Sequence, residues 1–169
     1  MDILVSACLL GTPCRYDGAS RPCGELARLE VLGHRLIPVC PEVMGGLPTP
    51  RPPAELQRDG RVVDRAGKDV TEAYRIGAEE VLELARAHGC TLAVLKERSP
   101  SCGRGQIYDG SFTGRLTEGS GVTARLLEEH GVQVYGESEA GTLAERGEAR
   151  EEGQRAPCPL PSKYPGKND

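Results

Sequence analysis

The chain has 169 residues, which suits one domain of ordinary size, and its single Phe and lack of Trp predict an aliphatic core. The net charge of -4 gives no general basic field, which argues against a protein dedicated to binding large nucleic acids. No apolar run approaches the roughly 20 residues of a membrane helix, and the first residues lack the features of a secretory signal. We therefore expect a cytoplasmic protein with no membrane partner.

Four short apolar runs rich in Val, Ile and Leu predict buried strands. They are Ile3–Leu9, Leu36–Cys40, Leu92–Lys96 and Val132–Tyr135. Helical patterns lie between them at Cys23–Leu32, Thr71–His88 and Gly121–His130. In the longest helix we expect Thr71 to cap the N-terminus and Gly89 to occupy the position after the C-terminus. This alternation predicts a single-domain, three-layer α/β, Rossmann-like fold with a small, mainly parallel sheet of about four strands.

Two long segments interrupt this pattern. Gly45–Asp69 is rich in Pro, Gly and Arg, and its run Arg61–Asp64 is typical of a small hairpin or of a segment that crosses the site. Ser99–Ser120 carries five glycines, and loops of such length are usually functional or disordered. From about Gly136 onward the chain is polar, so we expect a domain over residues 1–138 and a weakly ordered tail over residues 139–169.

Seven cysteines are many for a chain expected in a reducing compartment, where metal binding or catalysis is more typical than disulfides. No CxxC pair is present, which argues against a zinc ribbon or knuckle. Cys8 and Cys40 lie at the ends of the first two predicted strands, and Cys102 opens the loop after the third. Because parallel strands end at one sheet edge, these thiols are expected to converge as ligands for a soft metal or an iron–sulfur cluster. The alternative is that each is a small buried apolar side chain.

Cys14, Cys23, Cys90 and Cys158 fit this pattern less well and are interpreted as non-ligands. Cys14 lies in the loop after the first strand, so it is the cysteine of this group that comes nearest to the expected site.

Polar residues flank the three strand-end cysteines. Glu42 follows Cys40, while Ser99 and Ser101 precede Cys102 and supply hydroxyl groups close to it. Gly45 and Gly46 are expected to let the main chain approach a bound group.

Further candidates lie in segments that leave the same sheet edge. Tyr16 and Asp17 belong to one such loop and Tyr108 to another, and both loops are also compatible with simple turns. Arg51, between prolines, is either a solvated charge or a clamp for substrate, and Lys96 with Glu97 are candidate polar groups of the pocket.

Five linked motifs give the chain a family resemblance. They are Val5-Ser6-Ala7-Cys8-Leu9-Leu10-Gly11 with Arg15-Tyr16-Asp17-Gly18, Cys40-Pro41-Glu42-Val43-Met44-Gly45-Gly46-Leu47, Pro50-Arg51, Ser99-Pro100-Ser101-Cys102-Gly103, and Tyr108-Asp109-Gly110 with Phe112 and Gly114. In this order, from the N-terminus to about Tyr135, the chain resembles a bacterial family that includes the thiouracil desulfidases.

The resemblance implies a [4Fe–4S] cluster held by Cys8, Cys40 and Cys102, with one iron left open for the sulfur of a thiolated pyrimidine. It implies an enzyme that converts C=S to C=O in a small thiolated nucleobase such as 2-thiouracil, with the expelled sulfide captured by the open iron and no net redox change. Glu42 is then the first candidate for general acid–base work. Ser99 and Ser101 are candidates for orienting substrate or water, and the candidate substrate contacts are Tyr16, Asp17, Arg51, Lys96 and Tyr108.

Two other functions remain open at this stage. One is a module that uses a cluster or a metal ion for structure or sensing, which a fourth protein ligand such as Cys14 would favour. The other is a tRNA-related sulfur-transfer enzyme, which a Walker-type or pyrophosphatase-type nucleotide loop would favour. The sequence contains no such loop, and its acidic charge argues against binding of a large RNA.

Overall fold

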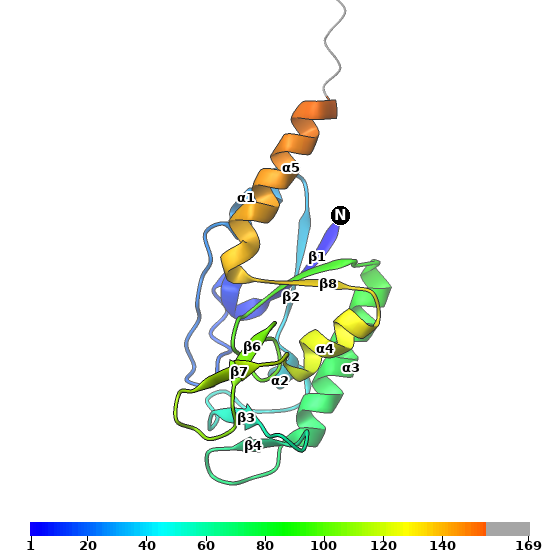
Figure 1. The fold of residues 1–169 in the computed structure, drawn as a ribbon. Helices are drawn as coiled ribbons and strands as arrows, with labels where there is room; N and C mark the ends of the chain where they lie inside the picture. Colours follow the sequence, from blue (N-terminus) through cyan, green and yellow to red (C-terminus); the bar gives the residue numbers. More distant parts are fainter. Residues whose placement is uncertain (155–169) are drawn as a thin grey trace, which may run out of the picture.

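The computed structural model describes residues 1–154 (Figure 1). Its central sheet contains β1 (Asp2–Ser6), β2 (Arg35–Val39), β5 (Leu92–Leu95) and β8 (Gln133–Gly136). The strand order is β2-β1-β5-β8, and every pair of neighbours is parallel. The predicted four-stranded parallel sheet is therefore confirmed.

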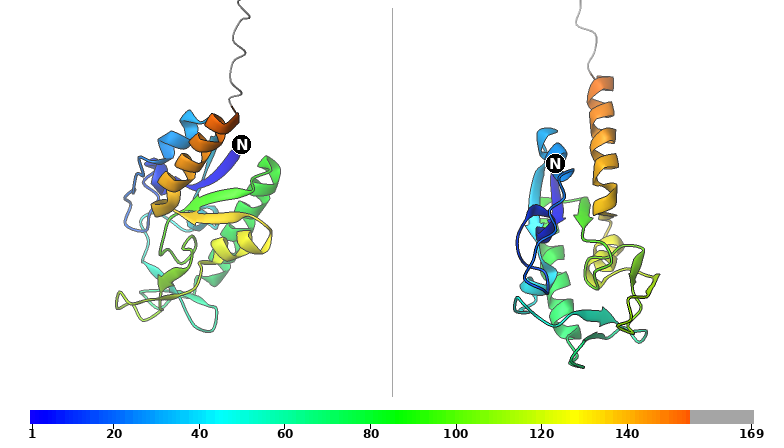
Figure 2. Two further views of the ribbon diagram at one scale, coloured as in Figure 1. Left: turned by 45° about the horizontal axis from the view of Figure 1, so that its top comes forward. Right: turned by 90° about the vertical axis from the view of Figure 1, so that its left-hand side faces the viewer.

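Helices cover both faces of this sheet (Figure 2). On one face lie α1 (Leu26–Val31) and α5 (Ala140–Gln154), and on the other α3 (Thr71–His88) and α4 (Val122–Glu129). Successive residues of β1 alternate between the two layers, because side chains along a strand point to opposite faces. Ile3 and Val5 pack with α1 and α5, whereas Leu4 packs with α3 and α4. This arrangement gives the three layers that the sequence predicts.

The first strand is shorter than predicted. It ends at Ser6, and Ala7–Leu10 form a 3-10 helix, η1, instead of continuing the strand to Leu9. Gly11 ends this turn with a φ of 95°, in the left-handed region that favours glycine. The turn is short, so Cys8 lies just beyond the carboxyl end of β1, where the chain leaves the sheet.

A short helix, α2 (Pro41–Met44), follows β2 directly and was not predicted. Pro41 occupies its first position, where the missing N–H costs no hydrogen bond. The helix crosses α3 at backbone contact: a Cβ on Gly45 would lie 1.9 Å from the Ala73 carbonyl oxygen, and one on Gly77 would lie 1.8 Å from that of Pro41. Gly45 thus serves contact between two helices and not, as predicted, the approach of a bound group.

This crossing supports a stability prediction. We expect Gly77→Ala to lower the free energy of unfolding by about 1–3 kcal/mol, because the added methyl group forces the two backbones apart. Glu80→Ala is the matched control: it is exposed on the same helix and should change stability by less than about 0.5 kcal/mol. Urea unfolding followed by circular dichroism measures both. Wild-type stability for Gly77→Ala would show that the helices do not cross this closely.

Two antiparallel hairpins lie at the lower end of the molecule in Figure 1. The first joins β3 (Ala54–Leu56) to β4 (Val62–Asp64), in agreement with the hairpin expected at Arg61–Asp64. The second joins β6 (Gln106–Tyr108) to β7 (Leu116–Glu118), within a glycine-rich segment for which no strand was predicted. Its strands have only three residues each, too few to show an alternating apolar pattern.

The start of α3 differs from prediction in its capping. Thr71 lies inside the helix after the cap position Val70. Its hydroxyl donates to Asp69 Oδ1 at 2.5 Å and accepts the Val62 N–H at 2.9 Å, which ties the helix to β4. Gly89 ends the helix with a φ of 62°, as predicted.

The first part of the predicted tail is also helical. Ala140 and Ala144, one turn apart in α5, are fully buried with α1. The buried face of α5 consists of alanines and not of large apolar residues, so the sequence of this segment gives little sign of a buried helix. The remainder of the predicted tail, residues 155–169, lies outside the described residues.

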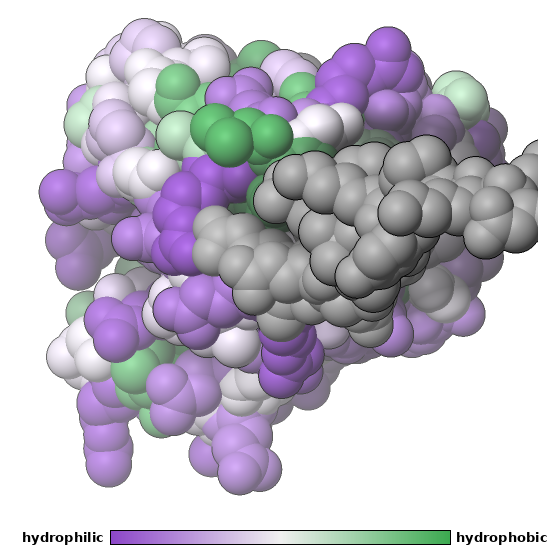
Figure 3. All heavy atoms as spheres, turned by 90° about the horizontal axis from the view of Figure 1, so that it is seen from above, coloured by the Kyte–Doolittle hydropathy of each residue, from purple (hydrophilic) through white to green (hydrophobic). Residues whose placement is uncertain are grey.

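The view from the α5 end shows a surface on which polar residues predominate and apolar ones form small separate areas (Figure 3). Within residues 1–154, no helix has both the length and the apolar character needed to cross a membrane.

Candidate active site

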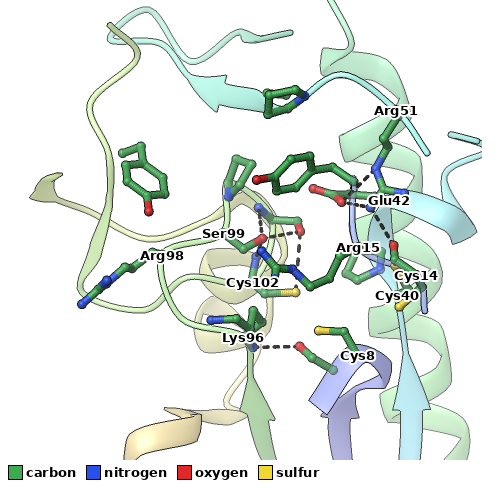
Figure 4. Close-up of a pocket in the computed structure, with 18 of the residues that line it drawn as sticks. Cys8, Cys14, Arg15, Cys40, Glu42, Arg51, Lys96, Arg98, Ser99 and Cys102 are labelled. Atoms are coloured by element: carbon green, nitrogen blue, oxygen red, sulfur yellow. Dashed lines mark hydrogen bonds and ion pairs between the residues drawn. The ribbon is translucent and has the colours of Figure 1, made fainter. Parts of the chain in front are cut away.

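A pocket of about 500 Å³ opens where β1, β2 and β5 end (Figure 4). Cys8, Cys40 and Cys102 all line it, as the strand-end argument predicts. They come from three elements: Cys8 from η1, Cys40 from the cap of α2, and Cys102 from the loop after β5. In the described part of the chain, no three His, Cys, Asp or Glu side chains surround one point closely enough to hold a single metal ion. The thiols are thus distributed over the pocket wall.

Burial in the pocket favours the protonated thiol at two of these residues, Cys8 and Cys102. Burial raises the pKa of Cys102 to about 12. Burial also raises the pKa of Cys8, although the positive charges of Lys96 and Arg15 act in the opposite direction. A metal centre needs thiolates, so binding at these residues would release protons.

Cys14 lines the same pocket, beside Cys40 (Figure 4). Its carbonyl oxygen accepts hydrogen bonds from the Cys40 thiol at 3.8 Å and from Arg51 Nη2 at 2.9 Å. Burial, and next the neighbouring Cys40, raises the pKa of the Cys14 thiol to about 12. The pocket therefore holds four cysteines where three were expected. Cys23 and Cys90 do not line it, and Cys158 lies outside the described residues.

The two serines before Cys102 form a hydrogen-bond chain that ends on its sulfur. Ser99 Oγ accepts the Cys102 N–H at 3.1 Å and lies 3.0 Å from Ser101 Oγ, which donates to Cys102 Sγ at 3.6 Å. Ser101 is 2% exposed. Its hydroxyl thus serves the cysteine, which differs from the expected role of orienting substrate or water, while Ser99 remains half-buried in the wall.

Glu42 is held in place from two sides. Arg51 forms an ion pair with its Oε2, with the Arg51 Nε at 3.1 Å, and Tyr74 Oη donates to its Oε1 at 2.5 Å. Burial, followed by the charge of Glu42, raises the pKa of Tyr74, so the phenol stays a donor. The Glu42 side chain is still 13% exposed, and it lines the pocket. The carboxylate is thus fixed at the pocket wall.

Arg51 is neither of the two things the sequence suggested. It is 9% exposed, so it is not a solvated loop charge. Besides Glu42, its guanidinium donates to the carbonyl oxygens of Cys14 and Pro48 and to Thr49 Oγ1 at 3.1 Å. These protein acceptors engage all three nitrogens of the guanidinium. Arg51 therefore organises the pocket wall, and none of its nitrogens is left free to bind substrate as a clamp.

Lys96 lines the pocket with its ammonium group fixed by Glu137 Oε1 at 2.5 Å. The other oxygen of Glu137 accepts the Glu97 N–H at 2.6 Å, and Glu97 Oε1 in turn accepts the Ser138 N–H at 3.0 Å. These contacts connect the end of β5 with the end of β8. The positive charge near Cys8 is therefore held by a carboxylate from beyond β8 that sequence reasoning had not connected to the site.

Of the remaining predicted substrate contacts, two line the pocket and one does not. Tyr16 and Tyr108 line the pocket. Asp17 does not: it is exposed, and its carboxylate accepts the Ala19 N–H at 3.0 Å, so the simple turn is the correct interpretation there.

Arg15 is a pocket residue that the sequence did not single out. Its side chain extends toward the loop of Ser99 and Cys102 (Figure 4), and its Nη1 is buried without a hydrogen-bond partner among the described residues. A buried donor of this kind is costly unless a ligand uses it. The only sequence signal was its place beside Tyr16 in a motif that also suited a turn.

The charge of the pocket opposes that of the whole chain. Six cationic side chains and three carboxylates line it. The cations are Arg15, Arg21, Arg51, Arg65, Lys96 and Arg98, and the carboxylates are Glu42, Glu55 and Glu97. A locally positive pocket favours electron-rich ligands, even in a chain of net charge -4.

Fold and pocket together define an α/β protein that gathers cysteine thiols in a cationic pocket at the carboxyl edge of a parallel sheet. The chain belongs to the 2-thiouracil desulfurase family, whose sequence model matches residues 3–139. This establishes the family to which the motifs pointed.

Two relatives extend the comparison. The protein YbbK of Bacillus subtilis (strain 168) is 44% identical over 146 residues, which cover 81% of this chain and 96% of YbbK. The solved structure of the [4Fe–4S]-dependent thiouracil desulfidase TudS is 50% identical, with a TM-score of 0.79, and the match covers 86% of this chain and 96% of TudS. Such similarity extends to the arrangement of the sheet and its helices.

Proposed function

We propose that this protein is a [4Fe–4S]-dependent desulfidase that removes sulfur from a thiolated pyrimidine such as 2-thiouracil. The observation that carries the proposal is the meeting of Cys8, Cys40 and Cys102 in one pocket, in a chain that is 50% identical to the desulfidase TudS. The overall reaction is a hydrolysis: 2-thiouracil and water give uracil and hydrogen sulfide, with no net oxidation or reduction.

The donor set suits a polynuclear cluster. Three thiols are distributed over the wall of the pocket, and as thiolates they are suitable ligands for the iron of a cluster. The cationic groups around them would offset the negative charge of the thiolates. Cys8, Cys40 and Cys102 would hold the cluster and leave one iron without a protein ligand. When bound, the cluster supplies a Lewis acid with affinity for the substrate's sulfur.

Residues of the chain then supply the proton chemistry and the positioning. Glu42, fixed by Arg51 and Tyr74, takes a proton from the attacking water and delivers it to the departing sulfur. The unpartnered Nη1 of Arg15 donates to a carbonyl oxygen of the pyrimidine ring. Ser101 donates to Cys102 Sγ, which reduces the charge on that ligand.

The test is product analysis with protein purified and reconstituted with iron and sulfide under strict anaerobic conditions. We expect 2-thiouracil to be converted to uracil and sulfide in equal amounts. An iron-loaded protein that releases no sulfide from 2-thiouracil would contradict the proposal.

One observation favours a second function, a cluster used only for structure or sensing. Cys14 lies in the same pocket as the three proposed ligands. If its thiolate closed the fourth position, no iron would be open to substrate. The effect of Cys14→Ala on iron content and on the visible absorbance spectrum separates the two functions.

A further inference from the structure

The outer wall of the pocket is built by two hairpins that lie far apart in sequence. Pro52, Pro53 and Ala54 at β3 form one part, and Tyr108, Phe112 and Gly114 of the β6–β7 hairpin form the other. Each hairpin is a separate two-stranded sheet, and such sheets are marginal by themselves. Contacts between the two hairpins therefore determine the position of this wall.

The side chain of Glu55 makes the principal connection. Its Oε1 accepts the N–H of Gly110 at 3.0 Å and the N–H of Phe112 at 3.1 Å. Gln57 Nε2 adds a bond to the Gly110 carbonyl oxygen at 3.2 Å. These three bonds join β3 and the residue after it to the tip of the β6–β7 hairpin.

Glu55 is an unusual choice for a purely structural contact. It is 9% exposed, and within residues 1–147 no cationic group lies within ion-pair distance of it. Burying a carboxylate without a cation is costly, and two backbone N–H donors offset that cost. The two hydrogen bonds from Gly110 and Phe112 to Glu55 hold the tip of the β6–β7 hairpin in one particular backbone conformation.

That conformation is a strained one. Phe112 has a φ of 58°, in the left-handed region that a bulky residue rarely adopts. Such strain persists where surrounding contacts impose it, and it is concentrated at sites that hold ligands. Glu55 holds the N–H of Phe112 itself, while Arg65 lies 5.9 Å from the centre of the ring. The ring is thereby fixed in the pocket wall.

We propose that Glu55 is a positioning residue for substrate specificity: it fixes the β6–β7 tip so that Phe112, with Tyr108, presents an apolar face to the planar ring of the thiolated heterocycle. Planar aromatic partners stack at such faces. This inference rests on the proposed function. It assigns Glu55 and Phe112 to binding of the substrate ring, whereas the cysteines are assigned to binding of the cluster.

The test compares Glu55→Ala, Glu55→Gln, Phe112→Ala and the double variant Glu55→Ala/Phe112→Ala in iron-loaded protein. We expect Glu55→Ala and Phe112→Ala each to raise the KM for 2-thiouracil and the Kd of uracil about tenfold, with kcat changed less than about twofold. Glu55→Gln should be milder, because its amide oxygen still accepts a hydrogen bond. The double variant should resemble the single ones, since Glu55 acts through Phe112.

Two further measurements separate positioning from general stability. Hydrogen exchange at the amides of Gly110 and Phe112 should accelerate in Glu55→Ala, while iron content stays at the wild-type level. Glu118→Gln, an exposed glutamate on β7, is the matched control and should change none of these quantities.

Wild-type KM and Kd values in Glu55→Ala and Phe112→Ala would overturn the inference, even if their melting temperatures fell. Additive effects in the double variant would overturn the positioning role. An iron-loaded wild type that fails to desulfurate 2-thiouracil would refute the proposed function instead, so the two failures are distinguishable.

Discussion

Cys102→Ala is expected to reduce bound iron to background after anaerobic reconstitution, and Cys8→Ala and Cys40→Ala should do the same. Each substitution removes one of the three thiolates that the proposed cluster requires. Iron and acid-labile sulfide per chain, with the visible absorbance spectrum, measure the effect. Retention of wild-type iron by Cys102→Ala would show that this thiol is not a ligand.

Cys90→Ala is a closely matched control. Cys90 and Cys102 belong to the same apolar cluster and are similarly buried, at 6% and 4% exposed. Cys90 does not line the pocket, so its loss creates a comparable cavity without removing a proposed ligand. Cys90→Ala should therefore keep its iron, and a loss of iron there would mean that core packing governs cluster binding.

Cys14→Ala decides between the two candidate functions. If three cysteines hold the cluster, this variant keeps its full iron content. A fall in iron, or a changed visible absorbance spectrum at unchanged iron content, would make Cys14 a ligand and would favour the structural or sensing module.

Glu42→Gln is expected to lower kcat for sulfide release by about 10²–10⁴-fold, the usual contribution of a general acid–base group, while bound iron stays unchanged. The amide keeps the shape of the side chain and loses its ability to exchange a proton. The measurement is turnover per cluster. Full turnover with an intact cluster would remove Glu42 from the mechanism.

Glu42 also has a structural role that must be separated from this effect. Its loss leaves the buried Arg51 without its carboxylate, and breaking a buried ion pair typically costs about 3–5 kcal/mol. Tyr74→Phe is the control, because it removes the hydrogen bond to Oε1 and keeps the charge. It should reduce kcat far less than Glu42→Gln, and unfolding experiments on both variants show how much of any loss is structural.

The sequence predicted those parts of the fold that depend on local pattern. The four strands coincide with short runs rich in Val, Ile and Leu, and the parallel order follows from the helices between them. The prediction that all four are buried was wrong for β2, an edge strand in which only Val39 is buried. The same reasoning placed Cys8, Cys40 and Cys102 at one edge, because the ends of parallel strands meet there. Elements with no such pattern were missed: α2 is a single turn, β6 and β7 have three residues each, and α5 buries alanines.

Individual side-chain roles were harder to predict, because they depend on partners far away in sequence. The sequence suggests an Arg51 that is solvated or free to bind substrate, but Glu42 and the Cys14 carbonyl engage it. Lys96 is paired with Glu137, which lies 41 residues further along the chain. Asp17 only closes a turn. No spacing rule in a single sequence indicates these pairings.

The most direct measurement is the rate of sulfide release from 2-thiouracil as a function of cluster occupancy. Samples reconstituted anaerobically with increasing iron and sulfide should show a rate proportional to bound cluster, with no turnover in the iron-free protein and uracil as the product. Full turnover by iron-free protein, or no turnover at full occupancy, would contradict a desulfidase that depends on a [4Fe–4S] cluster.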